Sequence, residues 1–359
     1  MATRVGKSTP APAPFTFRLP PELAASAPPE RRGINRDRVR LMVIDRAGDQ
    51  VVHTRFDHLC EFLQPGDLLV FNTSRTLPAA LDGQLSTDNT GVEIRLAGHL
   101  PDDSWLALLL CREGDPFTCG LRAGVRINLR EGLTAEVEER EERISRLWRL
   151  RFSKSGPELI DFLYRFGRPI RYEYVSAGWD LDYYQTVYAK EPGSAEMPSA
   201  GRAFTWRMLF DLKRRGVETA HVVLHTGLSS YMDDELDASH PSSEEEYLIS
   251  DVAAEKINSA RERGGRVIAV GTTVVRALES AADESGRVRS GHDYTLLRIT
   301  SDHELKAADG LLTGLHEPEA SHLDLLTAFL PAEKIKEAYE EAVRRQYLWH
   351  EFGDLNLIL

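Results

Sequence analysis

Between about residues 78 and 155 the sequence consists of short apolar runs separated by turns rich in Gly, Asn and Asp. At the end of this segment Trp148, Leu150 and Phe152 alternate with arginines, which is the period-two pattern of a strand with one buried face. Earlier runs of similar length lie at 92–96, 105–110, 125–129 and 133–137. Five or six strands at this spacing predict a small antiparallel β-barrel.

The segments on either side alternate between helical and extended patterns, which predicts a sheet covered by helices. With 359 residues, the chain is longer than one ordinary hydrophobic core accommodates. We therefore predict a mixed α/β (α+β) main domain of residues 16–77 and 156–359, with residues 78–155 inserted as the barrel. The strands expected in the main domain are 40–45, 51–56, 68–71, 221–225 and 266–270.

Apolar residues at helical spacing predict the helices of the main domain. Asp251 is expected to cap a helix that turns Val252, Ile257 and Ala260 inward and ends at Gly264. Further helices are expected at 58–63, over the apolar face 204–212, from the Gly-Thr-Thr turn through Leu278, and from Pro331 onward.

The composition is that of an ordinary globular protein, with 42% hydrophobic and 28% charged residues. Residues 1–15 lack the apolar stretch of a secretion signal, so we predict a disordered tail. The longest apolar run, 106–111, is far shorter than the roughly 20 residues of a membrane span. Cys60, Cys111 and Cys119 have no metal-ligand spacing, which is typical of free thiols in a reducing compartment; we expect a cytoplasmic protein without a metal.

The net charge of −12 argues against a protein that coats nucleic acid. It still allows a local basic groove, because net charge does not report how charges are distributed. We interpret the densest basic cluster as a solvated loop; it consists of Arg31, Arg32, Arg36, Arg38 and Arg40. The sequence does not determine the oligomeric state, and we favour a monomer.

One junction in the main domain suits a negatively charged or polar ligand. A predicted strand ends at Val270, and Gly271, Thr272 and Thr273 lead into a predicted helix. A helix N-terminus has unpaired N–H groups and a partial positive charge, and glycine lets a ligand approach closely. The sequence lacks GxGxxG and GxxxxGK[ST], so it predicts neither a dinucleotide fold nor an ATP-binding P-loop.

Two histidines and two acidic residues are candidates for chemistry. His225 ends an apolar strand, the position at which α/β sheets bind ligands, and His316 lies in a loop before a predicted helix. Glu245 belongs to an acidic run, and Asp354 precedes the last apolar residues. Each also fits a structural role, as a packed histidine, a solvated acid or a capping aspartate. Hydrolase, metalloprotease and kinase signatures are absent.

Several segments together resemble a known family. They are Pro65-Gly-Asp-Leu-Leu-Val-Phe-Asn72 with Arg75 and Pro78-Ala79, Tyr184-Gln-Thr-Val-Tyr-Ala-Lys190, Val270-Gly-Thr-Thr-Val-Val-Arg-Ala-Leu-Glu279, Asp309-Gly-Leu-Leu-Thr313 and Gly353-Asp354. Over about residues 19–359 the chain resembles the S-adenosylmethionine:tRNA ribosyltransferase-isomerase family of the queuosine pathway. Several ordered motifs are far more specific than any one alone. The resemblance implies the same fold, a β-barrel inserted in a larger α/β body.

The resemblance also implies a reaction. The ribosyl unit of S-adenosylmethionine moves onto the aminomethyl group of 7-aminomethyl-7-deazaguanine in tRNA. Adenine and methionine depart, and an epoxycyclopentanediol remains on the base, which gives epoxyqueuosine. S-adenosylmethionine is then a cosubstrate, tRNA a partner, and no metal is implied. The sulfonium acidifies the 5′ carbon, so a positioned base starts the reaction, and adenine needs an acid in order to leave.

Matching positions carry the family's functional residues onto this sequence. The catalytic candidates are His225, His316, Glu245 and Asp354. The substrate-binding candidates are Asn72, Arg75, Gln185, Tyr188, Gly201, Phe204, Thr205, Gly227, Gly271, Thr272, Thr273, Arg276 and Asp309.

Departures from the family pattern are concentrated at polar positions. Family Asn-Asp-Thr-Arg is Asn72-Thr-Ser-Arg75, Gly-Leu-His is Gly201-Arg-Ala203, His-Leu-Pro is His316-Glu-Pro318, and Tyr-Arg-Phe-Phe is Tyr347-Leu-Trp-His350. Losing a buried hydrogen-bond partner typically costs about 1–3 kcal/mol. The new polar groups, Arg202, Glu317 and His350, therefore indicate replacement of the ligand-reading positions.

Three hypotheses follow. The first is the family reaction on tRNA. The second is a related enzyme that keeps a pocket for S-adenosylmethionine or a purine nucleoside but uses another acceptor. The third is a catalytically silent binding protein on the same scaffold.

Overall fold

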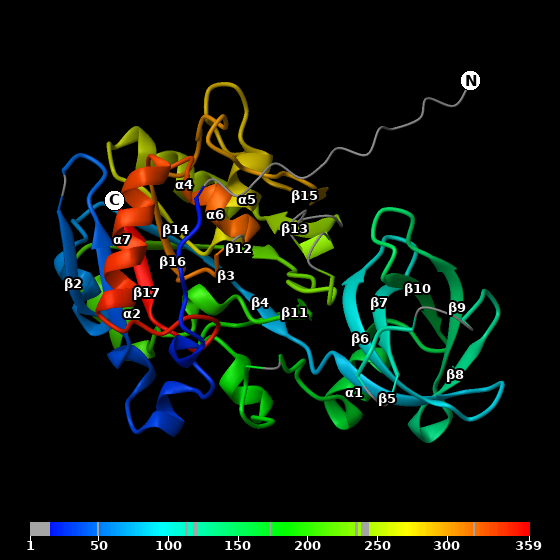
Figure 1. Ribbon diagram of the computed structural model, residues 1–359. Helices are drawn as coiled ribbons and strands as arrows, with labels where there is room; N and C mark the ends of the chain where they lie inside the picture. The colour runs from blue at the N-terminus through cyan, green and yellow to red at the C-terminus, as the bar shows by residue number, and fades with distance from the viewer. Residues whose placement is uncertain are drawn as a thin grey trace.

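A nine-stranded mixed sheet and a closed six-stranded antiparallel barrel form the framework of the protein. The computed structural model describes residues 15–48, 50–111, 114–117, 121–172, 174–233, 236–237, 244–318 and 320–359. The barrel lies beside the sheet, at the right in Figure 1. This arrangement confirms the predicted fold class.

The large sheet has a parallel centre. Its strand order is β15 (Gly291–Thr295), β13 (Glu245–Ile249), β12 (Glu218–Leu224), β3 (Leu68–Asn72), β14 (Val267–Val270), β16 (Gly310–Gly314), β17 (Leu355–Ile358), β1 (Arg40–Ile44) and β2 (Val51–Arg55). Strands β12, β3, β14 and β16 run parallel to one another. Their carboxyl ends therefore lie along one edge, the place where open α/β sheets bind ligands.

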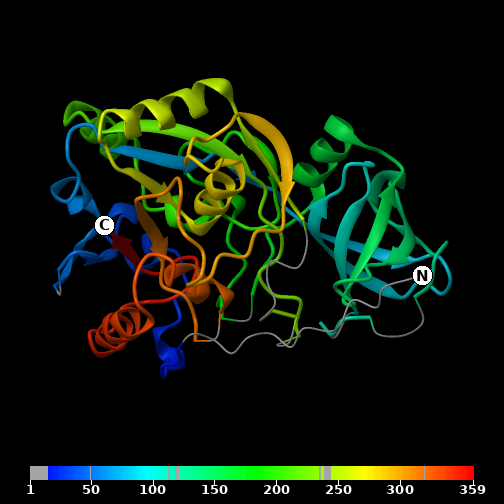
Figure 2. The same ribbon diagram turned by 90° about the horizontal axis from the view of Figure 1, so that it is seen from above.

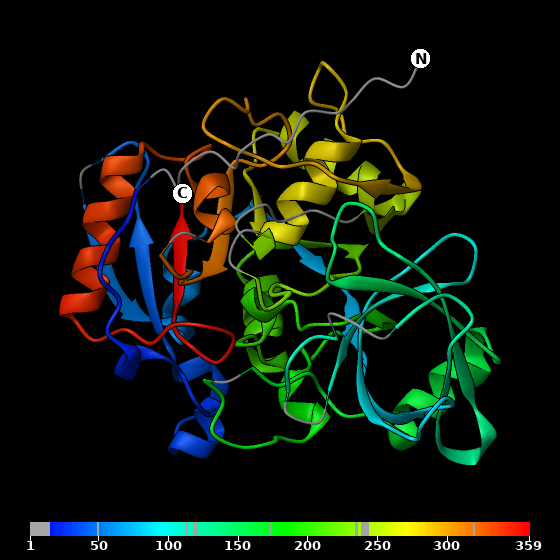
Figure 3. The ribbon, with the colours of Figure 1, turned by 45° about the vertical axis from the view of Figure 1, so that its right-hand side comes forward.

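Both faces of this sheet are covered, because successive residues of each strand point to opposite sides. In β3, Val70 belongs to one core cluster and Phe71 to the other. The cluster around Val70 includes residues of α4 (Asp251–Glu262), α5 (Thr272–Ala281), α6 (Ser321–Leu326) and α7 (Ala332–Arg344). Helix α4 lies along the sheet in Figure 2, and α7 lies beside β1 and β17 in Figure 3. The opposite cluster includes α2 (Trp206–Arg214) and the 3-10 segments η4 (Phe56–Glu61) and η7 (Ser199–Gly201).

The barrel consists of β5 (Ala80–Leu85), β6 (Gly91–His99), β7 (Trp105–Leu110), β8 (Arg126–Asn128), β9 (Thr134–Arg140) and β10 (Leu147–Phe152). Helix α1 (Gly156–Phe166) packs on it through Leu159, Phe162 and Leu163. Strand β4 (Ser74–Thr76) leads into the barrel and pairs with β11 (Glu191–Ser194) on the return. The barrel strands predicted from the short runs between turns are all present, whereas the limits of the two domains stay a prediction.

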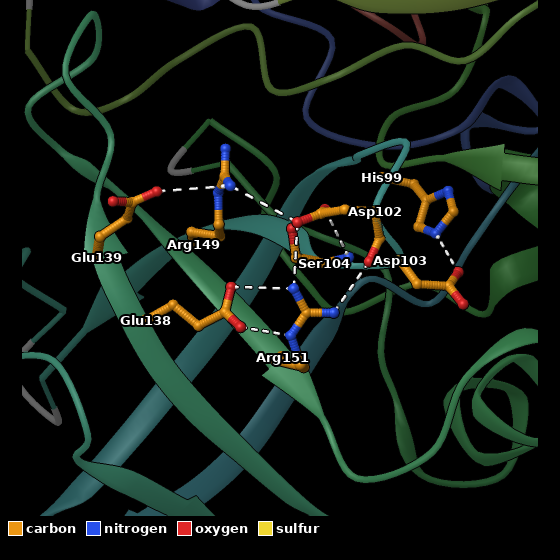
Figure 4. Close-up of polar contacts among 8 residues, drawn as sticks. All are labelled: His99, Asp102, Asp103, Ser104, Glu138, Glu139, Arg149 and Arg151. Carbon is orange, nitrogen blue, oxygen red and sulfur yellow. Dashed lines mark hydrogen bonds and ion pairs between the residues drawn. The ribbon is translucent and has the colours of Figure 1, made fainter.

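A polar network ties the turn between β6 and β7 to β9 and β10 (Figure 4). Oδ2 of Asp102 lies 3.1 Å from Nη2 of Arg151, which also pairs with Glu138. The Ser104 hydroxyl donates to Oδ1 of Asp102, and mainly this bond lowers the pKa of Asp102 to about 2. The Asp102 side chain is 48% exposed, so solvent screens these attractions.

Three sequence expectations need correction. Ser250, not Asp251, caps α4, because its hydroxyl accepts the N–H of Ala253 at 3.2 Å. Val252 is 65% exposed, since helix α4 buries Ala253 and Ala254 instead. The helix expected at 58–63 is the 3-10 segment η4 at 56–61.

The chain enters the core one residue earlier than predicted. Phe15 is buried against Phe17 and Tyr339, although it was assigned to the tail. Residues 1–14 of that tail and Cys119 lie outside the described residues, and Cys60 and Cys111 are free thiols. No helix in the described part of the chain is long and apolar enough to cross a membrane.

Candidate active site

A cavity of about 590 Å³ lies at the carboxyl edge of the parallel strands. Its walls come from the segments that follow α1, β11, β12, β14, β15 and β16 and from the first residue of β13. His350 and Glu351, which precede β17, complete the walls. Such a volume is in the usual range for pockets that bind small molecules. Of the candidates predicted from the sequence, the cavity wall contains Gly227, Glu245, Gly271, Thr272, Thr273, Arg276 and His316.

The junction between β14 and α5 forms one wall. Gly271 has a φ of +105°, a backbone conformation that L side chains rarely adopt, and it gives α5 no side-chain cap. The N-terminus of α5 at Thr272 and Thr273 therefore adjoins the cavity with its partial positive charge. A carboxylate or another anionic ligand group suits this wall.

A buried ion pair lies beside the α5 N-terminus. Nη1 of Arg276 donates to Oε2 of Glu245, and both side chains are buried. Nε of Arg276 donates to the carbonyl oxygen of Leu297 at 3.0 Å, and Oε1 of Glu245 accepts the N–H of Gly227 at 3.3 Å. Nη2 of Arg276 is buried and has no hydrogen-bond partner among the described residues. A buried donor without a partner is costly, so this nitrogen is suited to a ligand acceptor.

His316 is held in the wall after β16. Its Nε2 lies 3.0 Å from the hydroxyl oxygen of Thr313, and its ring stacks on His322 with centroids 4.7 Å apart. Burial, with His322 adding to it, lowers the pKa of His316 well below its ordinary value. The ring is therefore neutral at neutral pH and able to accept a hydrogen bond or a proton.

Two glutamates in the cavity wall were not predicted from the sequence. Oε1 of Glu196 accepts the N–H of Ser229 at 2.7 Å and the hydroxyl of Tyr172. Burial raises the pKa of Glu196 to about 7, and the charge of Glu245 adds to the effect. Burial raises the pKa of Glu351 to about 8, and the charge of Glu196 adds to this effect. Oε1 of Glu351 is buried and, in the described part of the chain, unpartnered.

The substituted positions Glu317 and His350 contact each other. Oε1 of Glu317 lies 2.9 Å from Nδ1 of His350, which lowers the pKa of Glu317. The His350 ring stacks on Tyr174 with centroids 4.0 Å apart, and Tyr174 in turn stacks on Tyr172 at 6.0 Å. These side chains form one continuous wall of flat rings along the cavity.

The third new polar group, Arg202, lies outside this cavity. Its guanidinium is buried, 2.8 Å from Oε2 of Glu30, and its Nε donates to the carbonyl oxygen of Tyr183 at 2.7 Å. It also lies over the ring of Phe352 at 5.2 Å. Arg202 therefore joins the N-terminal segment to the C-terminal loop.

The structure does not bring His225 to the cavity wall. Its Nδ1 lies 2.7 Å from the hydroxyl oxygen of Ser74, and its ring packs on Gly193 so closely that a Cβ there would lie 2.4 Å from it. Burial lowers the pKa of His225. These contacts place it at the junction between the sheet and the β4–β11 pair, where a packing role is supported.

Three other polar candidates bind main-chain groups instead of facing the cavity. Asp354 accepts the N–H of Arg40 at 2.7 Å and that of Leu348 at 2.8 Å. Asn72 accepts the N–H of Leu224 at 3.1 Å, and its Nδ2 also donates to the hydroxyl oxygen of Thr273 in the cavity wall at 3.3 Å. Asp309 accepts the N–H of Val267 at 2.8 Å. The catalytic role predicted for Asp354 therefore has no support from its contacts.

The remaining candidates pack the surrounding framework. Gln185 bonds to both main-chain groups of Thr76, and Arg75 donates to the hydroxyl of Tyr164 at 3.1 Å. Tyr188 and Phe204 pack on Phe71, Gly201 leaves room for the Tyr188 hydroxyl, and Thr205 caps α2.

The arginine cluster near the N-terminus serves the framework too. Arg32 donates to the carbonyl oxygen of Phe352 at 2.7 Å, and Arg40 lies over the ring of Tyr347 at 4.1 Å. Arg38 pairs with Asp57 at 3.1 Å. The interpretation of this cluster as a solvated loop is therefore wrong for two of its members, because Arg32 and Arg40 contact the C-terminal segment.

No group of three or more His, Cys, Asp or Glu side chains in the described part of the chain is arranged to hold a metal ion. The reactive groups of the cavity are instead carboxyls, a neutral imidazole and a guanidinium. Such a set can hold a polar ligand, accept a proton and donate one.

Comparisons with known proteins agree along nearly the whole chain. A family model for a queuosine biosynthesis protein matches residues 13–358. The S-adenosylmethionine:tRNA ribosyltransferase-isomerase of Carboxydothermus hydrogenoformans is 39% identical over 349 residues, which cover 96% of this chain and 98% of that protein. The protein of the same name from Heliobacterium modesticaldum is 38% identical, with the same shares covered.

A solved structure is similar as well. The crystal structure of S-adenosylmethionine tRNA ribosyltransferase from Thermotoga maritima matches with a TM-score of 0.54 at 32% sequence identity. The match covers 96% of this chain and 100% of that one. Sequence, fold and length thus agree, and the chain belongs to the queuosine biosynthesis protein family, with relatives named S-adenosylmethionine:tRNA ribosyltransferase-isomerase.

Proposed function

We propose that this chain is an S-adenosylmethionine:tRNA ribosyltransferase-isomerase. It transfers the ribosyl unit of S-adenosylmethionine to 7-aminomethyl-7-deazaguanine in tRNA and releases adenine and methionine. Family membership over residues 13–358 supports this assignment. S-adenosylmethionine is the cosubstrate and tRNA the partner.

One observation links the proposed reaction to this particular cavity. The unpartnered Nη2 of Arg276 and the N-terminus of α5 lie in the same cavity wall. A guanidinium and a helix N-terminus together recognise a carboxylate, and the methionine part of S-adenosylmethionine has one. We therefore assign the methionine carboxylate to Arg276, with Glu245 holding the guanidinium in place.

The other predicted residues in the wall become substrate contacts in this proposal. The hydroxyls of Thr272 and Thr273 and the N–H groups of the α5 N-terminus are available to the polar part of the cosubstrate. His316, neutral and fixed by Thr313, is suited to accept a hydrogen bond from a ribose hydroxyl. His225 and Asp354 are assigned to positioning the strands and the C-terminal loop.

The compartment and the assembly follow as part of the proposal. Because the acceptor is tRNA and the cysteines lack any paired spacing, we assign the protein to the cytoplasm. We propose that it acts as a monomer, which size-exclusion chromatography with light scattering tests directly.

A direct test uses purified protein, S-adenosylmethionine and tRNA that carries the aminomethyl-deazaguanine. Adenine and methionine are quantified by chromatography, and the modified base is identified by mass spectrometry after nuclease digestion. The proposal expects equal amounts of both products and of the modified base, all dependent on the tRNA. Adenine release without tRNA would identify another acceptor, and a lack of S-adenosylmethionine binding at millimolar concentration would indicate a silent scaffold.

A further inference from the structure

We propose that Glu351 is the acid that protonates the departing adenine, and that Glu196 is the base of the reaction. This inference rests on the proposed function and adds two residues that no sequence motif assigned. It also gives a reason for the altered C-terminal segment, in which His350 directly precedes Glu351.

The two carboxyls come from distant parts of the chain and line one cavity. Glu196 is held on Oε1 by Ser229 and Tyr172. Oε1 of Glu351 is buried without a hydrogen-bond partner among the described residues. Glu351 is therefore the carboxyl with a proton or a lone pair still to be used by a ligand.

The electrostatics of the cavity favour different protonation states for the two carboxyls. Burial raises the pKa of Glu351 to about 8 and that of Glu196 to about 7, and each value is raised further by neighbouring carboxyls. Near neutral pH, Glu351 is therefore mostly protonated while much of Glu196 is ionised, which is how two close carboxyls divide acid and base roles. The charged and titratable groups that act on the pair are Arg202, Glu245, Asp237, Tyr174 and Tyr184.

The backbone before Glu351 is held in an unusual conformation. His350 has a φ of +71°, in the left-handed region that favours glycine. The 2.9 Å contact with Glu317 and the stack on Tyr174 hold the His350 side chain in place. Strained residues of this kind persist where the surroundings over-determine them, which is typical of sites that position a functional group. Glu317, His350 and Tyr174 are thus positioning residues for Glu351.

Both carboxyls take part in the cleavage that releases adenine. The bond between C1′ of the ribose and N9 of adenine breaks, and its electron pair stays on adenine. The Glu351 proton moves to a ring nitrogen of the purine, so neutral adenine leaves and Glu351 becomes a carboxylate. Glu196 accepts the proton that the sulfonium makes acidic at the 5′ carbon. The electron pair left at the 5′ carbon forms a double bond to C4′ as the C4′–O4′ bond breaks, and the O4′ electron pair forms a carbonyl at C1′ as N9 leaves. After product release, Glu351 regains a proton and Glu196 loses one to solvent.

The test compares Glu351→Gln and Glu196→Gln with the wild-type protein. Glu337→Gln, the same chemical change on the exposed face of α7, is the matched control. We expect kcat for adenine release to fall by about 100-fold or more in each cavity variant, since general acids and bases typically contribute factors of this size. The affinity for S-adenosylmethionine, measured by calorimetry, changes by less than about three-fold, because the affected interaction belongs to the transition state.

The pH profile separates an acid from a merely structural residue. Wild-type kcat falls at acidic pH as Glu196 is protonated and at alkaline pH as Glu351 is ionised. Glu351→Gln loses the alkaline limb and keeps the acidic limb. A Glu351→Gln protein with wild-type kcat, or with an unchanged alkaline limb, overturns the inference.

A cosubstrate series tests the site of protonation. S-adenosylmethionine analogues whose purine lacks N7 or N3 remove the proton acceptor without changing the enzyme. One of the two analogues should strongly lower kcat for adenine release in the wild-type protein. The same analogue should lower kcat of the Glu351→Gln protein little further. Equal sensitivity of both proteins to both analogues contradicts the role of Glu351. If the wild-type protein itself releases no adenine with tRNA, the proposed function fails, which is a separate outcome.

Discussion

Nδ1 of His350 lies 2.9 Å from Oε1 of Glu317, so two positions at which the chain departs from the family pattern contact each other in the cavity wall. Both replace apolar residues of that pattern, leucine and phenylalanine. A change at either position alone would leave a charged or polar group without this partner. The paired change therefore replaces one set of contacts in the cavity wall by another set. It is not a succession of separate losses of contacts.

Restoring the family residues one at a time should impair the enzyme more than restoring both. We expect Glu317→Leu and His350→Phe each to lower kcat for adenine release about tenfold, because either change frees the backbone before Glu351. The double variant should lose much less than the product of the two effects. The melting temperature should change little, since a pair with one exposed partner contributes about 0–1 kcal/mol. Independent effects in the double-mutant cycle would contradict this coupling.

Arg276 should determine recognition of the methionine carboxylate. We expect Arg276→Lys to weaken S-adenosylmethionine binding by about tenfold, because lysine keeps the charge but loses the planar donor geometry. The wild-type protein should prefer S-adenosylmethionine to its decarboxylated analogue, and the variant should lose this preference. Arg287→Lys, on the surface, is the control. If calorimetry shows an unchanged preference in the variant, the methionine carboxylate binds elsewhere in the cavity.

The two histidines should separate activity from stability. His316 lines the cavity and is assigned to a ribose hydroxyl, so His316→Ala should lower kcat/KM by about tenfold or more. His225 packs on Gly193 and bonds to Ser74, so His225→Ala should lower the free energy of unfolding by about 1–3 kcal/mol and keep most of the activity. Steady-state kinetics and urea unfolding measure the two effects. A fully active His316→Ala protein would remove His316 from substrate binding.

The barrel should lose stability in acid through Asp102. Its folded pKa of about 2 lies below the ordinary value of 3.8, so the folded state binds the proton less readily. The contribution is therefore complete above about pH 4 and is lost as the pH falls toward 2. Urea unfolding, followed by the fluorescence of the barrel residues Trp105 and Trp148, should show this loss. Asp102→Asn should weaken the pH dependence, as should high salt.

Local patterns predicted the fold well. The run at 105–110 is β7 to the residue, because a short apolar run between turn residues is defined by a few neighbouring positions. The junction at Gly271-Thr-Thr also forms as predicted, since a strand, a glycine and a helix suffice to define it, and it lines the cavity. Val252 was misplaced because the cap shifted by one residue, which turns a different set of side chains inward.

The cavity lining was much harder to predict. Asn72 ends strand β3 and Asp354 directly precedes strand β17, and ligand-binding residues often occupy such positions. The side-chain oxygens of both residues nevertheless accept main-chain N–H groups. A sequence does not distinguish these two uses of a polar side chain. Glu196 and Glu351 became candidates only when the fold brought their segments together.

The measurement that tests the central claim most directly is a single-turnover reaction with S-adenosylmethionine labelled in its ribose. Excess enzyme is mixed with tRNA that carries the aminomethyl-deazaguanine or with the same tRNA carrying unmodified guanine. A ribosyltransferase-isomerase puts the label into the first tRNA alone and releases one adenine for each label transferred. Label that never enters tRNA, or adenine released equally with either tRNA, would contradict the assigned function.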